Sequence, residues 1–163
     1  MMGTIGRHKN QKEAIAVAKE LGMKLILAGK IRDQDYFEEL KKDIDGEQIK
    51  YLSEIGFEEK LKLYQNAKAF IFPINWEEPF GLVMIEAMSC GTPVVAFNRG
   101  AVSEVLRDNL TGYIVDNHSQ MVEAVKKIDS INREACRKHV EENFSVSKMV
   151  DSYEHTLLSL GNK

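Results

Sequence analysis

The chain has 163 residues, of which 44% are hydrophobic and 29% are charged, a composition typical of one soluble globular domain with its own core. Lys and Arg number 22 against 25 Asp and Glu, so the net charge of -3 leaves no basic excess for a nucleic-acid partner. The longest apolar runs, such as residues 69–74, fall far short of the ~20 residues that a transmembrane helix requires.

Short apolar runs alternate with helical patterns along the chain. Strands are expected at residues 2–5, 25–28, 48–52, 69–72, 93–97 and 112–115, and helices at 11–21, 36–44, 57–66, 80–89, 102–107, 119–128, 133–143 and 147–160. Because almost no hairpin turns separate the strands, we expect an α/β, Rossmann-like three-layer domain with a parallel sheet of about six strands. The pattern predicts a single domain over residues 1–163.

The chain begins almost inside its first expected strand. A short N-terminus explains this, and so does a preceding domain that has been cut away or is encoded separately. The first residues do not form a basic segment followed by an apolar core, so we expect no secretory signal. Cys90 and Cys136 lack the spacing of a disulfide framework or a metal site, so we expect a reducing, cytoplasmic location.

The most informative segment is residues 76–88, at the carboxyl end of an expected strand, where open α/β sheets bind ligands. A helix opens near Leu82, and its free N–H groups form an anion site that Gly81 leaves accessible. Glu86 lies one turn into this apolar helix, and a vicinal diol suits it because one carboxylate accepts two O–H hydrogen bonds. A Glu placed there only for the helix dipole is the alternative that spacing leaves open.

Glu78 and Glu86, with seven residues between them, match the EX7E motif of retaining glycosyltransferases with the GT-B fold. The sequence resembles family 4 of these enzymes, the glycosyl transferases group 1, in an ordered series of motifs: Gly6-Arg7 with Lys12-Glu13, Glu78-Pro-Phe-Gly-Leu, Glu86-Ala-Met, Gly91-Thr-Pro-Val-Val, Gly100, Glu104-Val and Gly112-Tyr-Ile-Val. The resemblance covers almost the whole chain, but only the carboxy-terminal, donor-binding half of the two-domain enzyme.

The resemblance implies a site for a nucleotide-diphosphate sugar. Arg7 and Lys12 would hold the diphosphate and, with Glu78 on the donor sugar, form the catalytic set. Glu86 would bind the ribose hydroxyls. The other substrate-binding residues implied are Gly6, Ile55 near the base, and the backbone of Phe80, Gly81 and Leu82 around the sugar and phosphate. No cofactor and no metal is expected.

Two positions, Glu13 and Ser53, depart from the family pattern. Glu13 replaces the glycine that usually follows Lys12, which puts an acid close to the phosphate site. Lys9 lies in the same loop and is a second candidate for the role of Lys12. Ser53 stands where glycine is usual, so the contacts to the base stay open.

Two Asp-x-Asp matches, at residues 33–35 and 43–45, are of the kind that holds a metal in the other large transferase fold. Three-residue patterns arise easily by chance, and acidic surface loops explain both. The apolar stripe of the last expected helix, at residues 146, 149, 150, 153 and 157, predicts core packing, with part of it left as an interface toward an amino-terminal domain.

The resemblance favours the donor domain of a hexosyltransferase. We expect it to be inactive alone, with the N-terminal acceptor domain or subunit absent from this chain. Peripheral membrane association of the whole enzyme is compatible with this interpretation. Two alternatives stay open: a non-catalytic nucleotide-sugar-binding subunit, and a GT-B-type nucleotide-sugar epimerase.

Overall fold

The computed structural model describes residues 1–161 and confirms a Rossmann-like α/β fold in which every strand pairing is parallel. The strands are β1 (Leu25–Ala28), β2 (Ile49–Leu52), β3 (Phe70–Phe72), β4 (Val94–Phe97) and β5 (Gly112–Val115). The α-helices are α1 (Gln11–Glu20), α2 (Gln34–Lys41), α3 (Phe57–Asn66), α4 (Leu82–Ser89), α5 (Val102–Val105), α6 (His118–Lys126), α7 (Arg133–Asn143) and α8 (Val146–Gly161), with short 3-10 helices η1 (Arg7–Lys9) and η2 (Ile128–Ser130).

The strands form two sheets, β1-β2 and β3-β4-β5, where the sequence predicts one sheet of about six strands. The expected first strand makes only isolated parallel bridges, Met2 with Ala28 and Ile5 with Ile31. Within the described residues no backbone hydrogen bond joins residues 1–5 to β3. The run at residues 2–5 is therefore an extended segment beside β1 that does not join the two sheets into one.

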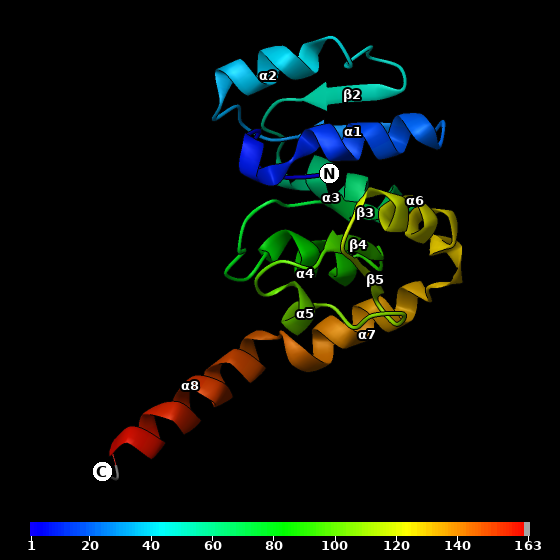
Figure 1. The fold of residues 1–163 in the computed structure, drawn as a ribbon. Coiled ribbons are helices and arrows are strands. Elements are labelled where there is room, and N and C mark those ends of the chain that lie inside the picture. The colour runs from blue at the N-terminus through cyan, green and yellow to red at the C-terminus, as the bar shows by residue number, and fades with distance from the viewer. Residues whose placement is uncertain (162–163) are drawn as a thin grey trace.

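Helices cover both faces of the β3-β4-β5 sheet. Helix α4 packs on β3 and β4, whereas α6 packs on β4 and β5 from the opposite side (Figure 1). Helix α1 lies against β1 and α6 and buries Ala14, Ile15, Val17 and Ala18, as its apolar periodicity predicts. These layers place the loop after each strand at one edge of the molecule.

Apart from the run at residues 2–5, the expected helices and strands lie within a few residues of the observed ones. Helix α2 begins at Gln34, two residues earlier than expected, because the Asp33 carboxylate accepts a hydrogen bond from the Tyr36 N–H at 2.9 Å. Asp45, in the second Asp-x-Asp match, accepts three backbone N–H groups, from residues 47, 48 and 49. These acids shape local turns.

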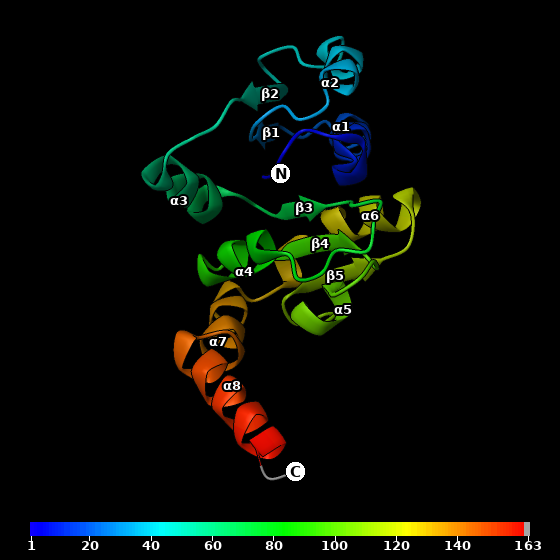
Figure 2. The ribbon, with the colours of Figure 1, turned by 90° about the vertical axis from the view of Figure 1, so that its left-hand side faces the viewer.

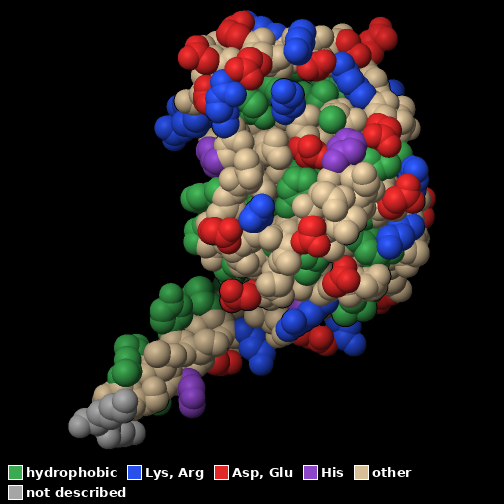
Figure 3. All heavy atoms as spheres, viewed as in Figure 1, with side chains coloured by type: hydrophobic (Ala, Val, Ile, Leu, Met, Phe, Trp, Pro, Cys, Tyr) green, Lys and Arg blue, Asp and Glu red, His purple; other side chains and the backbone are tan. Residues whose placement is uncertain are grey.

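Helix α8 extends away from the rest of the molecule (Figures 1 and 2). The prediction that its stripe packs into the core is wrong, because Val146, Tyr153 and Leu157 are 74%, 66% and 66% exposed. Hydrophobic side chains line one side of the helix in the space-filling view (Figure 3). Nothing within residues 1–161 covers this stripe. Those residues also contain no helix that is long and apolar enough to span a membrane.

A histidine bridges α6 and α1. The Nδ1 atom of His118 lies 2.7 Å from Glu13 Oε1, and its Nε2 atom lies 2.8 Å from Glu20 Oε2. The hydrogen bonds to Glu20 and Glu13 raise the pKa of His118 above its ordinary value of 6.5. Glu13, the acid that departs from the family pattern, is thereby paired with a cation when His118 is protonated.

This raised pKa predicts a pH-dependent contribution to stability. Since His118 binds its proton more tightly in the folded state, its stabilisation is fully present below about pH 6.5 and is lost as the pH rises through the folded pKa. His118→Gln should lower the free energy of unfolding by at most about 1 kcal/mol at pH 6, the scale of solvent-exposed ion pairs. Denaturant titrations at pH 6 and pH 9 measure the difference, with His155→Gln on exposed α8 as the control. A deficit that grows with pH would contradict the assignment.

Candidate active site

Three loops meet at one edge of the molecule: the loop around η1, the β3–α4 loop and the β4–α5 loop. The loop around η1 joins the β3–α4 loop through a hydrogen bond from the Asn75 N–H to the His8 carbonyl, at 2.8 Å. A second bond, from Asn10 Nδ2 to the Pro73 carbonyl at 3.0 Å, supports the same contact. The β4–α5 loop approaches from the other side, because the Ala101 N–H donates to the Glu78 carbonyl at 2.8 Å. The β3–α4 loop is thus held on both flanks.

Gly100 permits the approach of the β4–α5 loop. Its φ is +54°, and a Cβ atom there would lie 2.3 Å from the Glu78 carbonyl oxygen and 2.4 Å from the Glu78 nitrogen. Only glycine fits so close to another backbone in this conformation. The Gly100 N–H also donates to Glu77 Oε2 at 2.6 Å. This glycine of the motif series therefore positions the segment that carries Glu78.

Glu78 is the best-sheltered acid of the site and is paired with Lys9. The Lys9 Nζ atom lies 2.6 Å from Glu78 Oε2, and the two side chains are only 16% and 11% exposed. The Trp76 Nε1–H donates to the same oxygen at 3.0 Å, and the Lys9 ammonium lies 5.1 Å from the Trp76 ring centroid. Lys9, the sequence's second candidate, is thus the lysine that lies beside Glu78.

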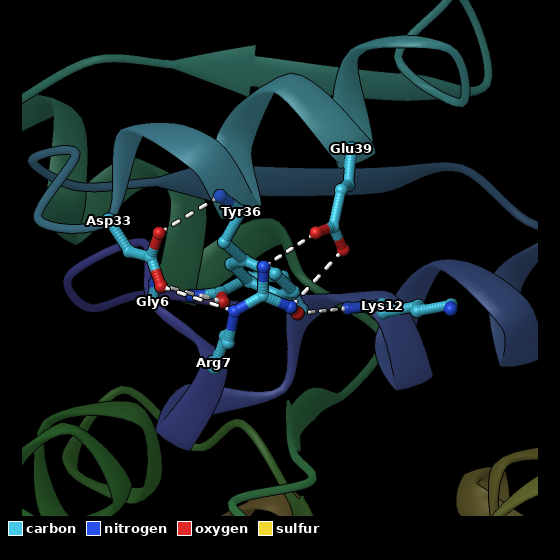
Figure 4. A network of polar contacts seen from close by, with 7 residues as sticks. Gly6, Arg7, Lys12, Asp33, Tyr36 and Glu39 are labelled. Carbon is cyan, nitrogen blue, oxygen red and sulfur yellow. Dashed lines mark hydrogen bonds and ion pairs between the residues drawn. The ribbon is translucent and has the colours of Figure 1, made fainter.

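Arg7 points toward α2 (Figure 4). Its Nη1 atom donates to Glu39 Oε2 at 3.2 Å, and its Nε atom lies 3.5 Å from Asp33 Oδ2. The bond to Arg7 lowers the pKa of the Glu39 carboxyl. Because the Arg7 side chain is exposed, its ion pairs add little stability, and the guanidinium is able to exchange these carboxylates for another anion.

Lys12 does not share a site with Arg7 in this structure. It lies exposed in the first turn of α1, and its side chain points away from the Arg7 guanidinium (Figure 4). Its backbone N–H donates to the Tyr36 hydroxyl at 2.9 Å, which ties the start of α1 to α2. The described residues form no ion pair with the Lys12 ammonium, so this charge faces solvent.

The start of α4 offers backbone donors next to Glu78. Gly81 precedes the helix with φ +82°, and Met84 N–H is the first amide there that bonds back, to the Gly81 carbonyl at 2.9 Å. The N–H groups of Leu82 and Val83 have no acceptor within the described residues, as at any open helix start. They form the anion-binding end that the sequence predicts, with exposed Phe80 and Leu82 at its rim.

Glu86 lies one turn further along α4 and is held from α3. Lys60 Nζ donates to its Oε1 atom at 2.7 Å, and the Tyr64 hydroxyl donates to its Oε2 atom at 3.2 Å. Burial and the neighbouring Glu86 charge raise the pKa of Tyr64, which keeps this hydroxyl protonated. Neither donor is among the site residues predicted from the sequence, although their i,i+4 spacing on a helix places them on one face.

The remaining predicted residues lie around this edge. Gly6 is buried immediately before η1, and its N–H faces Gln11 Oε1 at 3.4 Å. Ile55 is half-buried between β2 and α3, and Ser53 is exposed nearby. Among residues 1–161 no cluster of three or more His, Cys, Asp or Glu side chains is arranged to hold a metal ion.

A separate apolar cavity of about 290 Å³ lies between β1 and β3, bordered by α1 and α3. Its lining includes Met1, Val17, Leu25, Leu63 and Phe70. It does not contain Glu78, Glu86 or Arg7. The candidate site is therefore the meeting point of the three loops, where the Lys9–Glu78 pair lies beside the open start of α4, and not this cavity.

The family model for glycosyl transferases group 1 matches residues 1–144. The chain belongs to this family. Over 126 residues it is 33% identical to an uncharacterised 41.2 kDa protein of the Klebsiella pneumoniae cps region, and over 113 residues it is 31% identical to the Bacillus subtilis putative glycosyltransferase YtcC. These matches cover 73% and 62% of this chain but only 34% and 28% of the two relatives.

Solved structures share the fold. The Anabaena protein HepE, crystallised with UDP-glucose, superposes with a TM-score of 0.83 at 21% identity, and AviGT4, a glycosyltransferase of avilamycin A biosynthesis, with 0.84 at 24%. The superpositions cover 97% and 98% of this chain. They cover 48% and 49% of the other chains, so this chain spans about half the length of these proteins.

The Lys9–Glu78 pair yields a stability prediction. Lys9→Met should lower the free energy of unfolding by about 1–3 kcal/mol, because it leaves a sheltered carboxylate without its cation. Lys12→Met, the same change on an exposed side chain, should stay within about 0.5 kcal/mol of the parent. Urea denaturation at neutral pH measures both. Equal effects of the two variants would show that the pair adds no stability.

Proposed function

We propose that this chain is the donor-binding domain of a retaining family 4 hexosyltransferase, and that it binds a nucleotide-diphosphate sugar at the meeting point of the three loops. One observation carries the proposal: the open N-terminus of α4 lies between two acids in fixed surroundings, Glu78 before it and Glu86 within it. Membership of glycosyl transferases group 1 supports it. So do the UDP-glucose complex of HepE and the curated D-inositol 3-phosphate glycosyltransferases among the relatives.

Each group has a role that its surroundings suit. The N–H groups of Leu82 and Val83 would receive the diphosphate. Arg7 would turn to it from Glu39, since a solvent-exposed ion pair contributes little stability and is readily exchanged for another. Lys12 would add its solvent-facing charge. Glu78 would accept hydrogen bonds from the sugar, while its ion pair with Lys9 holds the carboxylate in position.

The transfer step needs a second domain or subunit that binds the acceptor. The C1–oxygen bond to the diphosphate breaks, the acceptor oxygen bonds to C1 on the same face, and the acceptor proton passes to the leaving phosphate. Stabilising that phosphate is the contribution of the α4 amides, Arg7 and Lys12. An N-terminal acceptor domain or subunit would supply the acceptor, and the exposed stripe of α8 is our candidate for part of its docking surface.

Binding of the donor is the first test. Calorimetry and thermal shift with UDP, GDP and ADP, each with its sugar conjugates, should identify one preferred base. A ligand at ~100 times its dissociation constant adds about 2.7 kcal/mol of stability. Glu86→Ala should weaken that ligand by about 1.5–3 kcal/mol, the scale of hydrogen bonds to a charged group. Glu134→Ala, an exposed acid on α7 outside the motif series, is the control. Absence of binding by every nucleotide would refute the proposal.

Glu78 should govern recognition of the sugar. Because its partner is the sugar and not the nucleotide, Glu78→Gln should reduce the preference for the nucleotide sugar over the bare nucleoside diphosphate. The comparison is made by calorimetry on folded protein, with the bare diphosphate as the internal control. Identical losses for the two ligands would assign Glu78 to shaping the loop.

The described domain should bind donor without transferring sugar. An open half-site forgoes the positioning of an acceptor, which contributes ~7–11 kcal/mol to lowering a barrier. Purified chain, the preferred donor and a panel of sugar and lipid acceptors should release no more nucleoside diphosphate than donor alone. Robust acceptor-dependent release would contradict the half-enzyme assignment, and isomerised donor would indicate an epimerase.

A further inference from the structure

Lys60 and Tyr64 hold Glu86 from the facing helix. The two residues are one turn apart on α3, and each donates to a different oxygen of the Glu86 carboxylate, at 2.7 Å and 3.2 Å. Tyr64 is buried, whereas the Lys60 and Glu86 side chains are 28% and 37% exposed. The contact therefore lies at the boundary between the helix interface and solvent, where a ligand can still reach Glu86.

This arrangement leaves half of the hydrogen-bond acceptor sites of the Glu86 carboxylate unoccupied. An ionised carboxylate offers about four lone-pair sites, two on each oxygen. Lys60 takes one site on Oε1 and Tyr64 takes one on Oε2, so each oxygen keeps one site for an incoming donor. Two free sites on the two oxygens of one fixed carboxylate match the two hydroxyls of a vicinal diol.

The positive charge of Lys60 also favours binding of an anionic ligand beside Glu86. A nucleoside diphosphate is strongly anionic, and an uncompensated carboxylate beside its ribose would repel it. The Lys60 ammonium at 2.7 Å neutralises that carboxylate without occupying both of its oxygens. Tyr64 supplies a hydrogen bond but no charge, and its raised pKa keeps it a donor.

We propose that Lys60 is a positioning residue that, with Tyr64, orients Glu86 for the 2′- and 3′-hydroxyls of ribose and so makes the site selective for ribonucleotides over 2′-deoxyribonucleotides. The inference rests on the proposed function, because it assumes that Glu86 faces the ribose. It adds a residue of α3, outside the segment that carries the two acids, to the determinants of ligand choice.

The test compares one nucleoside diphosphate with its 2′-deoxy form, using whichever base the parent chain prefers. Lys60→Met should reduce the ribose-over-deoxyribose affinity ratio by about fivefold, which corresponds to about 1 kcal/mol. Lys60→Arg retains the charge and the donor and should restore most of the ratio. Lys62→Met is the matched control, since Lys62 lies exposed on the same helix and forms no ion pair among the described residues. Calorimetry gives the ratios, and urea denaturation confirms that each variant is folded.

Each outcome has one meaning. A parent chain that binds no nucleoside diphosphate refutes the proposed function and the inference together. A parent that prefers ribose and loses this preference in Glu86→Ala but keeps it in Lys60→Met upholds the proposed function and overturns the role of Lys60. Equal weakening of both ligands by Lys60→Met overturns it too, because a merely structural role would act on both alike. Lys60→Gln, which keeps a neutral donor, serves if the Met variant does not fold.

Discussion

The contact between Lys9 and Glu78 is the constraint on which the arrangement of the site depends. It joins the loop before α1 to the loop before α4, two segments far apart in the sequence. Both side chains are largely removed from solvent, so neither charge is tolerated there without the other. Trp76 completes the contact by donating to the same carboxylate oxygen.

The rest of the edge follows from this contact. With the β3–α4 loop held by Lys9 on one side and by Gly100 and Ala101 on the other, Gly81 presents the first amides of α4 outward. Glu86 comes one turn later on the same helix, where α3 supplies its partners. A chain with a net charge of -3 thus gathers donors and cations locally at one edge without any overall basic field.

The cations are distributed in a way that the motif spacing does not reveal. Arg7 bonds Glu39 on α2, Lys12 faces solvent, and Lys9 is the lysine beside Glu78. The two outer charges are exposed and free to reorient toward an anion, whereas the inner one is committed to an acid. In the donor site that we propose, the inner lysine maintains the shape of the site and the outer cations meet the ligand.

Local information in the sequence determined the elements and the positions of the acids. Apolar periodicity predicts α1 and α3 closely, the buried runs predict β1 and β5, and the glycine before Leu82 marks the start of α4, because these features depend on neighbours along the chain. Tertiary structure alone decided three other points. Within residues 1–161, the run at residues 2–5 makes bridges only to β1 and to Ile31 just beyond it, α8 leaves its stripe exposed, and Lys60 with Tyr64 reaches Glu86. Each depends on what lies across space from a residue, and the period of a helix or strand specifies which face is apolar but not what covers it.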